Sequence, residues 1–380
     1  PAALIAALAG ELFLASGVLP FNDLTTPEAW RDSRFTQLQV TAFLEDQQPG
    51  GRTLSISSID FAPGDRAALE ARFSAQGLSE TAIRTAFIAI KLKETLAANL
   101  PLVYGIPSAD GFDGGLLPTG VYTAFTSLLL PEGEPPTLDG RLREILSRPA
   151  SCRGACLPDV RWLNLMNVRY LVADKVFDLW HEDVAYDTQF EYVTGGDAVN
   201  HPIVVPFRAT AVDLLIACPD DVPCLSPAVI LIDAAGSETR LEGQLTDARV
   251  DSYQRARLTF PTPVTPAALR FESETPITVR AATLIDARTE DFQQTTFAPW
   301  VRVLSSDIKL YENTSVMPRA FVISGDIRFA PDDAAALALL RDPAFDPRQT
   351  LILSGAGEPM MSAPAAATLR SRLNQRAGWC

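Results

Sequence analysis

Between residues 187 and 288, short runs in which apolar and polar residues alternate recur at regular intervals. Turn-forming residues separate the runs, and each run is long enough for one strand. The runs lie at 203–207, 211–217, 228–233, 255–260, 268–271 and 277–285. Short strands at such spacing are typical of an antiparallel β-sandwich of about a hundred residues. The pattern therefore predicts a jelly-roll-like sandwich over residues 187–288.

The segments on both sides of this sandwich combine helical and strand patterns. Helices are predicted over 66–76, 80–98, 122–130, 142–147, 162–166, 333–340 and 363–376, and strands over 52–59, 168–173 and 350–353. Asp65 and Ser79 are of the residue types favoured at helix N-caps. The expected fold class is α+β, a mixed α/β body of residues 20–186 and 289–380 that is interrupted by the sandwich. The 29 prolines among 380 residues favour loops and edge strands.

The stretch 309–324 (KLYENTSVMPRAFVIS) is predicted to form a β-hairpin. Residues 313–315 (Asn, Thr, Ser) favour a turn because their side chains hydrogen-bond to the local backbone. Pro318 pushes the residue before it toward extended geometry, so we expect a second strand over 320–323.

Residues 1–19 (PAALIAALAGELFLASGVL) are almost wholly apolar, with Glu11 as the one acidic residue. Their number is close to the roughly 20 residues that span a bilayer. A signal peptide is a poor fit, because there is no initiator Met and no basic region. Two interpretations are open: the end of a transmembrane helix, which we favour, or a buried core helix. In the first, Glu11 is expected to face protein rather than lipid.

The formal net charge of −14 argues against a nucleic-acid partner, because phosphate contacts need clustered Lys and Arg side chains. It also argues against a peripheral helix on anionic lipid. The glycines at 111, 114 and 115 lack the lysine and the helix that a phosphate-binding loop needs. Neither histidine, His181 or His201, is accompanied by a Gly-x-Ser-x-Gly elbow. We therefore expect no cofactor and no catalytic residue within this chain.

The five cysteines form two close pairs, Cys152 with Cys156 and Cys218 with Cys224, and a lone Cys380. Each pair lies in a loop-like stretch with Gly, Pro or Asp nearby, which favours two short-loop disulfides in an oxidising, extracytoplasmic compartment. A zinc site is the more specific alternative, but neither pair has the Cys-x-x-Cys spacing or a nearby His. Free buried thiols are the third interpretation. We expect no metal site.

Five blocks of sequence follow one another in a fixed order along the chain. The apolar helix runs into VLPFN at 18–22, and the later blocks are NLPLVYGIPSADGFDGGLLPTGVY at 99–122, LNLMNVRYLVAD at 163–174, IKLYENTSVMPRAFVISGD at 308–326 and DPAFDPRQTLIL at 342–353. In this order they resemble the bacterial YfhO-like integral membrane proteins, which are grouped with polyprenyl-phosphate-dependent glycosyltransferases of the GT-C type. The blocks cover most of the chain outside the predicted sandwich.

The resemblance implies that this chain is an extracytoplasmic region, with residues 1–19 as the end of a late transmembrane helix. In the family, a bundle of such helices transfers a sugar from a lipid-phosphate donor to an acceptor on the outer membrane face. The acidic residue of GT-C enzymes lies in an early loop, which is not part of this chain, and neither is the β-rich segment with a Gly-Trp motif that usually follows. The resemblance therefore implies an enzyme only for the larger protein, and an accessory or acceptor-recognising role for this region.

The loop 104–113 is the first candidate for substrate binding. Tyr104 and Phe112 can stack on a sugar ring, and Asp110 and Asp113 can accept hydrogen bonds from hydroxyls or bind a hard cation. The alternative is a turn in which glycines supply positive φ angles and the Asp side chains cap the backbone.

Arg319 is the second candidate, because a guanidinium group binds phosphate or carboxylate with two hydrogen bonds. The alternative is an internal ion pair with an acidic residue such as Glu312.

Two functions follow as hypotheses. The first is the extracytoplasmic region of a glycosyltransferase-like protein of the cell membrane, which assists acceptor binding or shapes the membrane active site. Its partners are the membrane, through the N-terminal helix, and a glycan or lipid-linked sugar. The second is a non-enzymatic surface module whose sandwich binds glycan or a partner protein in a membrane or cell-wall assembly. The first requires a large hydrophobic polypeptide before residue 1, whereas the second requires only an anchor.

Overall fold

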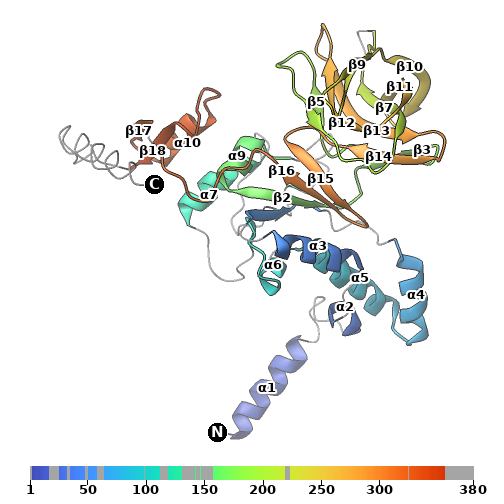
Figure 1. The fold of residues 1–380 in the computed structure, drawn as a ribbon. Coiled ribbons are helices and arrows are strands. Elements are labelled where there is room, and N and C mark those ends of the chain that lie inside the picture. Colours follow the sequence, from blue (N-terminus) through green and yellow to red (C-terminus); the bar gives the residue numbers. More distant parts are fainter. Residues whose placement is uncertain are drawn as a thin grey trace.

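The computed structural model describes residues 2–16, 25–31, 35–47, 50–57, 64–97, 99–111, 119–130, 142, 146, 157–218, 223–323 and 325–355. In this part the protein has an α+β fold, as the sequence predicts. Most helices precede residue 168, and mainly antiparallel sheets follow it (Figure 1).

A four-stranded sheet in the order β1–β2–β16–β15 forms the body. Its strands are β1 (Arg52–Ser55), β2 (Val168–Ala173), β15 (Trp300–Ser305) and β16 (Lys309–Asn313). Strand β2 is buried along nearly its whole length, as its apolar sequence VRYLVA predicts. It pairs in parallel with β1 and antiparallel with β16. Segments from both sides of residues 187–288 therefore build one sheet.

Helices pack on both faces of this sheet. The helices before β2 are α2 (Glu28–Arg31), α3 (Phe35–Asp46), α4 (Arg66–Ala75), α5 (Glu80–Glu94), α6 (Leu100–Val103), α7 (Gly120–Thr126), a 3-10 turn (Ser127–Leu129) and α9 (Val160–Leu165). Val40 and Leu44 of α3 pack with Tyr170 of β2. Leu163 of α9 packs with Leu171, which points to the opposite face of the same strand.

Helices α4 and α5 share a small hydrophobic cluster of their own. The rings of Phe73 and Phe87 meet edge to face, with centroids 6.3 Å apart. Ser79 caps α5 as predicted, since its Oγ accepts the N–H of Ala82 at 3.2 Å. The helix ends at Glu94 rather than at residue 98, because Leu96 adopts a φ of 49°, outside the helical range.

Two antiparallel sheets form the sandwich. The larger has the order β10–β11–β7–β13–β14 with β5 beside β13, and the smaller has the order β6–β12–β8–β9. The strands are β5 (Tyr192–Val193), β6 (His201–Pro202), β7 (Ala209–Ala217), β8 (Ala228–Asp233), β9 (Glu238–Leu241), β10 (Gln244–Val250), β11 (Tyr253–Val264), β12 (Pro266–Glu272), β13 (Thr278–Asp286) and β14 (Asp291–Thr295). Leu214 and Leu284 of the larger sheet share one buried cluster with Leu231 and Leu269 of the smaller sheet.

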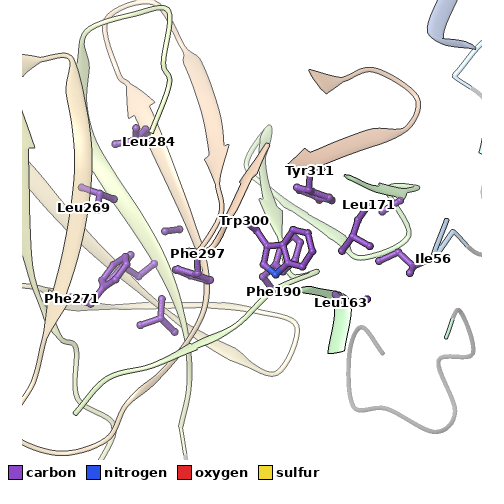
Figure 2. Close-up of a cluster of buried hydrophobic side chains, with 14 of the residues drawn as sticks. Ile56, Leu163, Leu171, Phe190, Leu269, Phe271, Leu284, Phe297, Trp300 and Tyr311 are labelled. Atoms are coloured by element: carbon purple, nitrogen blue, oxygen red, sulfur yellow. The ribbon is translucent and has the colours of Figure 1, made fainter. Parts of the chain in front are cut away.

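The core of the sandwich is continuous with the core of the body (Figure 2). The ring of Phe190, in the segment that leads into the sandwich, stacks on Trp300 at 5.6 Å between centroids. The same ring meets Tyr311 of β16 edge to face at 4.7 Å. One hydrophobic cluster thus extends from Leu284 to Leu171, and burial of its shared part couples the two halves.

A hairpin covers the outer face of the larger sheet. It consists of β3 (Asp178–His181) and β4 (Val184–Asp187), and Tyr186 of β4 packs with Leu215 and Ala281 of the sheet. Its two turn residues, Glu182 and Asp183, have φ angles of 49° and 62°, as a type I′ turn requires. Sequence patterns miss this hairpin because Glu-Asp is not among the favoured dipeptides of that turn.

The side chain of Lys309 joins this hairpin to the body sheet. Its Nζ lies 2.5 Å from Asp178 Oδ1 and 2.9 Å from Asp187 Oδ1, and the lysine is fully buried. The hydroxyl of Tyr311 donates to the other oxygen of Asp187 at 2.5 Å. Burial alone raises the pKa of Asp187, but the Lys309 charge and these hydrogen bonds outweigh it and hold that pKa below its ordinary value.

Two predicted strands are wrong. Residues 320–323 form no strand, and the hairpin over 309–324 is absent, because both edges of β16 are already taken by β2 and β15. Residues 203–207 also form no strand, and β6 is instead the short pair His201–Pro202. Pro202 and Pro206 have no N–H to donate, which limits the pairing of this segment.

The C-terminal described segment is a small parallel unit, in which β17 (Asp326–Ala330) and β18 (Thr350–Ser354) flank α10 (Asp333–Arg341). The predicted helix at 333–340 and strand at 350–353 are confirmed. Asp332 caps α10 by accepting the N–H of Ala335 at 2.8 Å. The predicted helix over 363–376 lies outside the described residues.

Helix α1 (Ala2–Ser16) exposes its apolar side chains, Leu4, Leu8 and Phe13 among them. This contradicts the alternative of a buried core helix. No helix in the described ranges has both the length and the apolar character needed to cross a membrane. The end of a transmembrane segment stays a prediction.

His201 lies in an aromatic cluster inside the sandwich. Its ring centroid is 4.5 Å from that of Tyr192 and 5.2 Å from that of Phe271. Its Nδ1 accepts the N–H of Ala298 at 2.9 Å, and burial lowers the pKa of the imidazole from 6.5 to about 4. His201 is therefore a neutral core residue at physiological pH.

Replacing Lys309 by Met is expected to lower the free energy of unfolding by about 3–5 kcal/mol, because Asp187 is left buried without its counter-charge. Urea denaturation monitored by tryptophan fluorescence measures the change. Arg328→Met, at an exposed arginine of β17 in the C-terminal unit, is the control and should shift stability by no more than about 0.5 kcal/mol. Equal effects of the two substitutions would contradict a structural role for the Lys309 ion pairs.

His201 should make stability fall in mildly acidic solution. Below pH 6.5 the unfolded chain takes up a proton that the folded imidazole, with its pKa of about 4, does not. Relative to His201→Gln, which keeps a hydrogen-bond acceptor but cannot titrate there, the wild type should lose about 2–3 kcal/mol between pH 7.5 and 4.5. Urea unfolding across this range tests it, and parallel pH profiles for the two proteins would refute it.

Candidate functional site

A cleft of about 400 Å³ opens where three segments of the body meet. The first is the start of β1 at Arg52, the second is the loop after α6 at Pro107, and the third is 316–319, which ends at Arg319. Asn167, between α9 and β2, also lines the cleft. Of the substrate-binding residues that the sequence suggests and the structure describes, Arg319 alone lines this cleft.

Backbone pairing fixes Arg52 at one wall. Its N–H donates to the carbonyl of Asn167 at 2.8 Å, and its Nη1 donates to the carbonyl of Met166 at 3.3 Å. Gly51, the residue before it, has a φ of 125°, and a Cβ at this position would lie 2.7 Å from Cβ of Arg169. Glycine therefore allows the chain to approach β2 closely enough for Arg52 to begin the parallel strand.

Asn167 holds the wall that carries Arg319. Its Nδ2 donates a buried hydrogen bond to the carbonyl of Met317 at 2.7 Å. Asn167 has a φ of 57°, a left-handed conformation that Asn adopts more readily than most residues. Met317 is itself buried, whereas the side chain of Arg319 is exposed. The exposed guanidinium thus extends from a segment that is anchored in the core.

The ion pair suggested for Arg319 and Glu312 does not form. Glu312 of β16 is bound by Arg169 of β2, whose Nη2 and Nε lie 2.7 and 2.9 Å from Oε1. Among the residues described above, no carboxylate pairs with Arg319 or with Arg52. Two guanidinium groups therefore line one cleft without a counter-charge from the described chain.

The two arginines act on each other electrostatically. Burial lowers the pKa of Arg52, and the positive charge of Arg319 lowers it further. Two positive charges in a partly desolvated cleft repel each other, which raises the free energy of the unoccupied protein. An anion bound between them relieves this repulsion. Guanidinium groups bind phosphate and carboxylate with paired, charge-assisted hydrogen bonds. The cleft therefore has the chemistry of an anion site.

Tyr122 lies within electrostatic reach of the same group. Burial raises the pKa of its phenol, the Asp110 carboxylate raises it further, and Arg52 lowers it in part. Thr119 fixes the start of α7 by accepting the N–H of Tyr122 at 3.2 Å. The phenol consequently remains a hydrogen-bond donor at neutral pH.

Asp110 belongs to a loop that extends the body sheet beside β1. The N–H of Thr53 donates to the carbonyl of Pro107 at 2.8 Å, so the loop runs along the strand that carries Arg52. The buried carboxylate of Asp110 accepts the N–H groups of Gly111 at 2.9 Å and of Leu142 at 3.1 Å. Asp110 therefore caps backbone, as the turn interpretation predicts.

The other residues of the suggested sugar-binding loop are not brought together at the cleft. Tyr104 is partly buried against the cluster that includes Val40 and Ile106, and it does not line the cleft. Phe112 and Asp113 lie outside the described residues. A sugar platform made of Tyr104 and Phe112 stays a prediction.

The sequence reveals neither Arg52, in the cleft wall, nor Tyr122, which interacts with it electrostatically. One begins a strand and the other lies in the first turn of a helix, and neither position carries a functional pattern. The one local signal is the Gly50–Gly51 pair before Arg52, which is typical of a close backbone approach.

Cys218 and Cys224 form one of the predicted disulfides, in the connection from β7 to β8. Cys152, Cys156 and Cys380 lie outside the described residues. Within the part of the chain that is described, no three His, Cys, Asp or Glu side chains are grouped so as to hold a metal ion.

The chain matches no protein-family model, no curated protein sequence and no solved structure.

Proposed function

We propose that this chain is the extracytoplasmic, substrate-binding region of a membrane glycosyltransferase-like protein of the YfhO-like, GT-C type. Its cleft between Arg52 and Arg319 binds the phosphate of the lipid-linked sugar donor. The sugar transfer itself takes place in the transmembrane helices of the larger protein. The observation that carries the proposal is the pair of guanidinium groups that line one cleft without a carboxylate partner among the described residues.

The charge balance of the chain supports this assignment. The chain has 46 acidic and 32 basic residues, so carboxylates outnumber the basic groups with which they can pair. Arg169, on the next strand, has such a partner in Glu312. Two adjacent arginines that lack one are therefore best explained by an anion supplied from outside the chain.

The walls of the cleft suit a phosphate ester with an apolar tail. Apart from the two arginines, the lining includes Pro107, Val316 and Met317, which offer apolar surface next to the charged groups. A polyprenyl monophosphate, which is the donor without its sugar, combines the same two properties, an acidic head and a hydrocarbon chain. Inorganic phosphate shares only the first, so comparing its binding with that of farnesyl phosphate separates the contributions of charge and apolar contact.

Isothermal titration calorimetry of the full chain with farnesyl phosphate tests the cleft. Arg52→Gln and Arg319→Gln should each weaken binding at least about tenfold, because each removes charge-assisted hydrogen bonds worth about 1.5–3 kcal/mol. Arg328→Gln, at an exposed arginine on β17, is the matched control and should bind like the wild type. Absence of binding by the folded wild type, or equal binding by all four proteins, would rule out this site.

The membrane assignment has a separate test. The native polypeptide, extracted from membranes, should have an intact mass well above the 41.1 kDa of this chain and should yield peptides from many apolar helices. A mass close to that of the chain alone would contradict the glycosyltransferase interpretation. It would favour the non-enzymatic surface module. Mass spectrometry of the endogenous protein gives the answer without any variant.

A further inference from the structure

A second cleft, of about 430 Å³, lies where the chain passes between the body sheet and the sandwich. Both connecting segments line it, 189–191 on the way in and 297–299 on the way out. Val160 of α9, Arg280 of β13 and Trp300 of β15 complete its walls. The cleft is therefore built jointly by the body and the sandwich.

One polar group in its wall lacks a hydrogen bond. The side chain of Arg280 is only 6% exposed, and its Nη1 and Nη2 bind Glu191 Oε2 at 2.6 Å and the carbonyl of Thr188 at 2.7 Å. Its Nε is buried and has no partner among the described residues. A buried donor without an acceptor costs about 1–3 kcal/mol, so the described chain leaves one polar group at this junction unsatisfied.

Gln189 adds a donor and an acceptor to the same cleft. The residue is 3% exposed, and its backbone N–H is bound by Asp187, but no described residue hydrogen-bonds to its side-chain amide. An amide can accept one hydroxyl hydrogen and donate to another oxygen. Gln189 therefore presents a donor and an acceptor to a ligand that carries several hydroxyls.

The charges of the lining argue against an ionic ligand. The positive charge of Arg280 is balanced by Glu191, at 2.6 Å, so that an anion would meet the carboxylate and a cation would meet the guanidinium. This distinguishes the second cleft from the cleft of Arg52 and Arg319, which has two positive charges.

Aromatic rings supply the apolar part of the walls. Phe190 and Trp300 are stacked at 26° and 5.6 Å, which holds both rings in place, and Phe297 lies beside them (Figure 2). Ligand sites of this size usually combine such apolar walls with a few fixed polar groups. A pyranose ring can place its C–H faces against the apolar walls and its hydroxyls against the polar groups.

We propose that the cleft bounded by Gln189, Arg280 and Trp300 binds an uncharged hexopyranose unit of a glycan. This site is independent of the proposed phosphate site, because it shares no lining residue with it. It gives the sandwich a binding role at its junction with the body rather than on its outer surface.

Saturation-transfer difference NMR of the full chain tests the site with methyl α-D-glucopyranoside, methyl α-D-mannopyranoside and methyl α-D-galactopyranoside as probes. At least one should receive saturation from the wild type. Gln189→Leu removes the amide hydrogen bonds at nearly constant volume and should weaken that binding at least fivefold. Val160→Phe replaces a side chain in the cleft wall by a larger one and should abolish the binding.

Val193→Phe is the matched control, because Val193 is exposed on β5 and does not line the cleft. It should bind like the wild type, as should Arg319→Gln, whose side chain lies in the other cleft. No saturation of any probe by the folded wild type would overturn the proposal. Binding that persists in both Gln189→Leu and Val160→Phe would overturn it as well, since the sugar would then lie elsewhere.

Discussion

The ammonium group of Lys309 lies fully inside the protein, between the carboxylates of Asp178 and Asp187. Moving a charge out of water costs several kcal/mol, so a buried lysine is tolerated only where carboxylates and hydrogen bonds surround it. Here the lysine comes from the body sheet, whereas both carboxylates come from the β3–β4 hairpin that covers the sandwich. In this placement of the hairpin the charge is satisfied, and the ion pairs tie the larger sheet, through the hairpin, to the body.

The hydrophobic core reinforces the same coupling. Phe190 and Trp300 contact each other where the chain enters and leaves the sandwich, and Tyr311 extends the contact to β16. The hydroxyl of Tyr311 also binds Asp187, so the apolar and the ionic couplings share a residue. The cleft at the junction inherits its shape from these contacts. A rigid junction explains how groups from separate elements can be held in the positions that a ligand requires.

The two clefts differ in the class of ligand that their charges admit. The cleft of Arg52 and Arg319 has two positive charges and apolar walls, whereas that of Gln189 and Arg280 is neutral and lined by aromatic rings. Under the proposals above, one recognises the phosphate of a lipid-linked donor and the other an uncharged sugar. Each proposal rests on a different, separately testable set of side chains.

The sequence by itself determined the elements whose identity depends on local pattern. The buried strands β2, β7, β8 and β13 and the Ser79 cap of α5 all follow from burial or hydrogen bonding encoded within a few residues. Periodicity records that a residue is buried but not which element covers it, so residues 320–323 were predicted as a strand although both edges of β16 are taken by β2 and β15. The Glu182–Asp183 turn was missed for a related reason, since packing of the hairpin on the larger sheet imposes it.

Arg319 stood out as a lone arginine, but only the tertiary structure placed Arg52 beside it and gave Glu312 to Arg169, because the electrostatic partner of a charge is decided by distance in space.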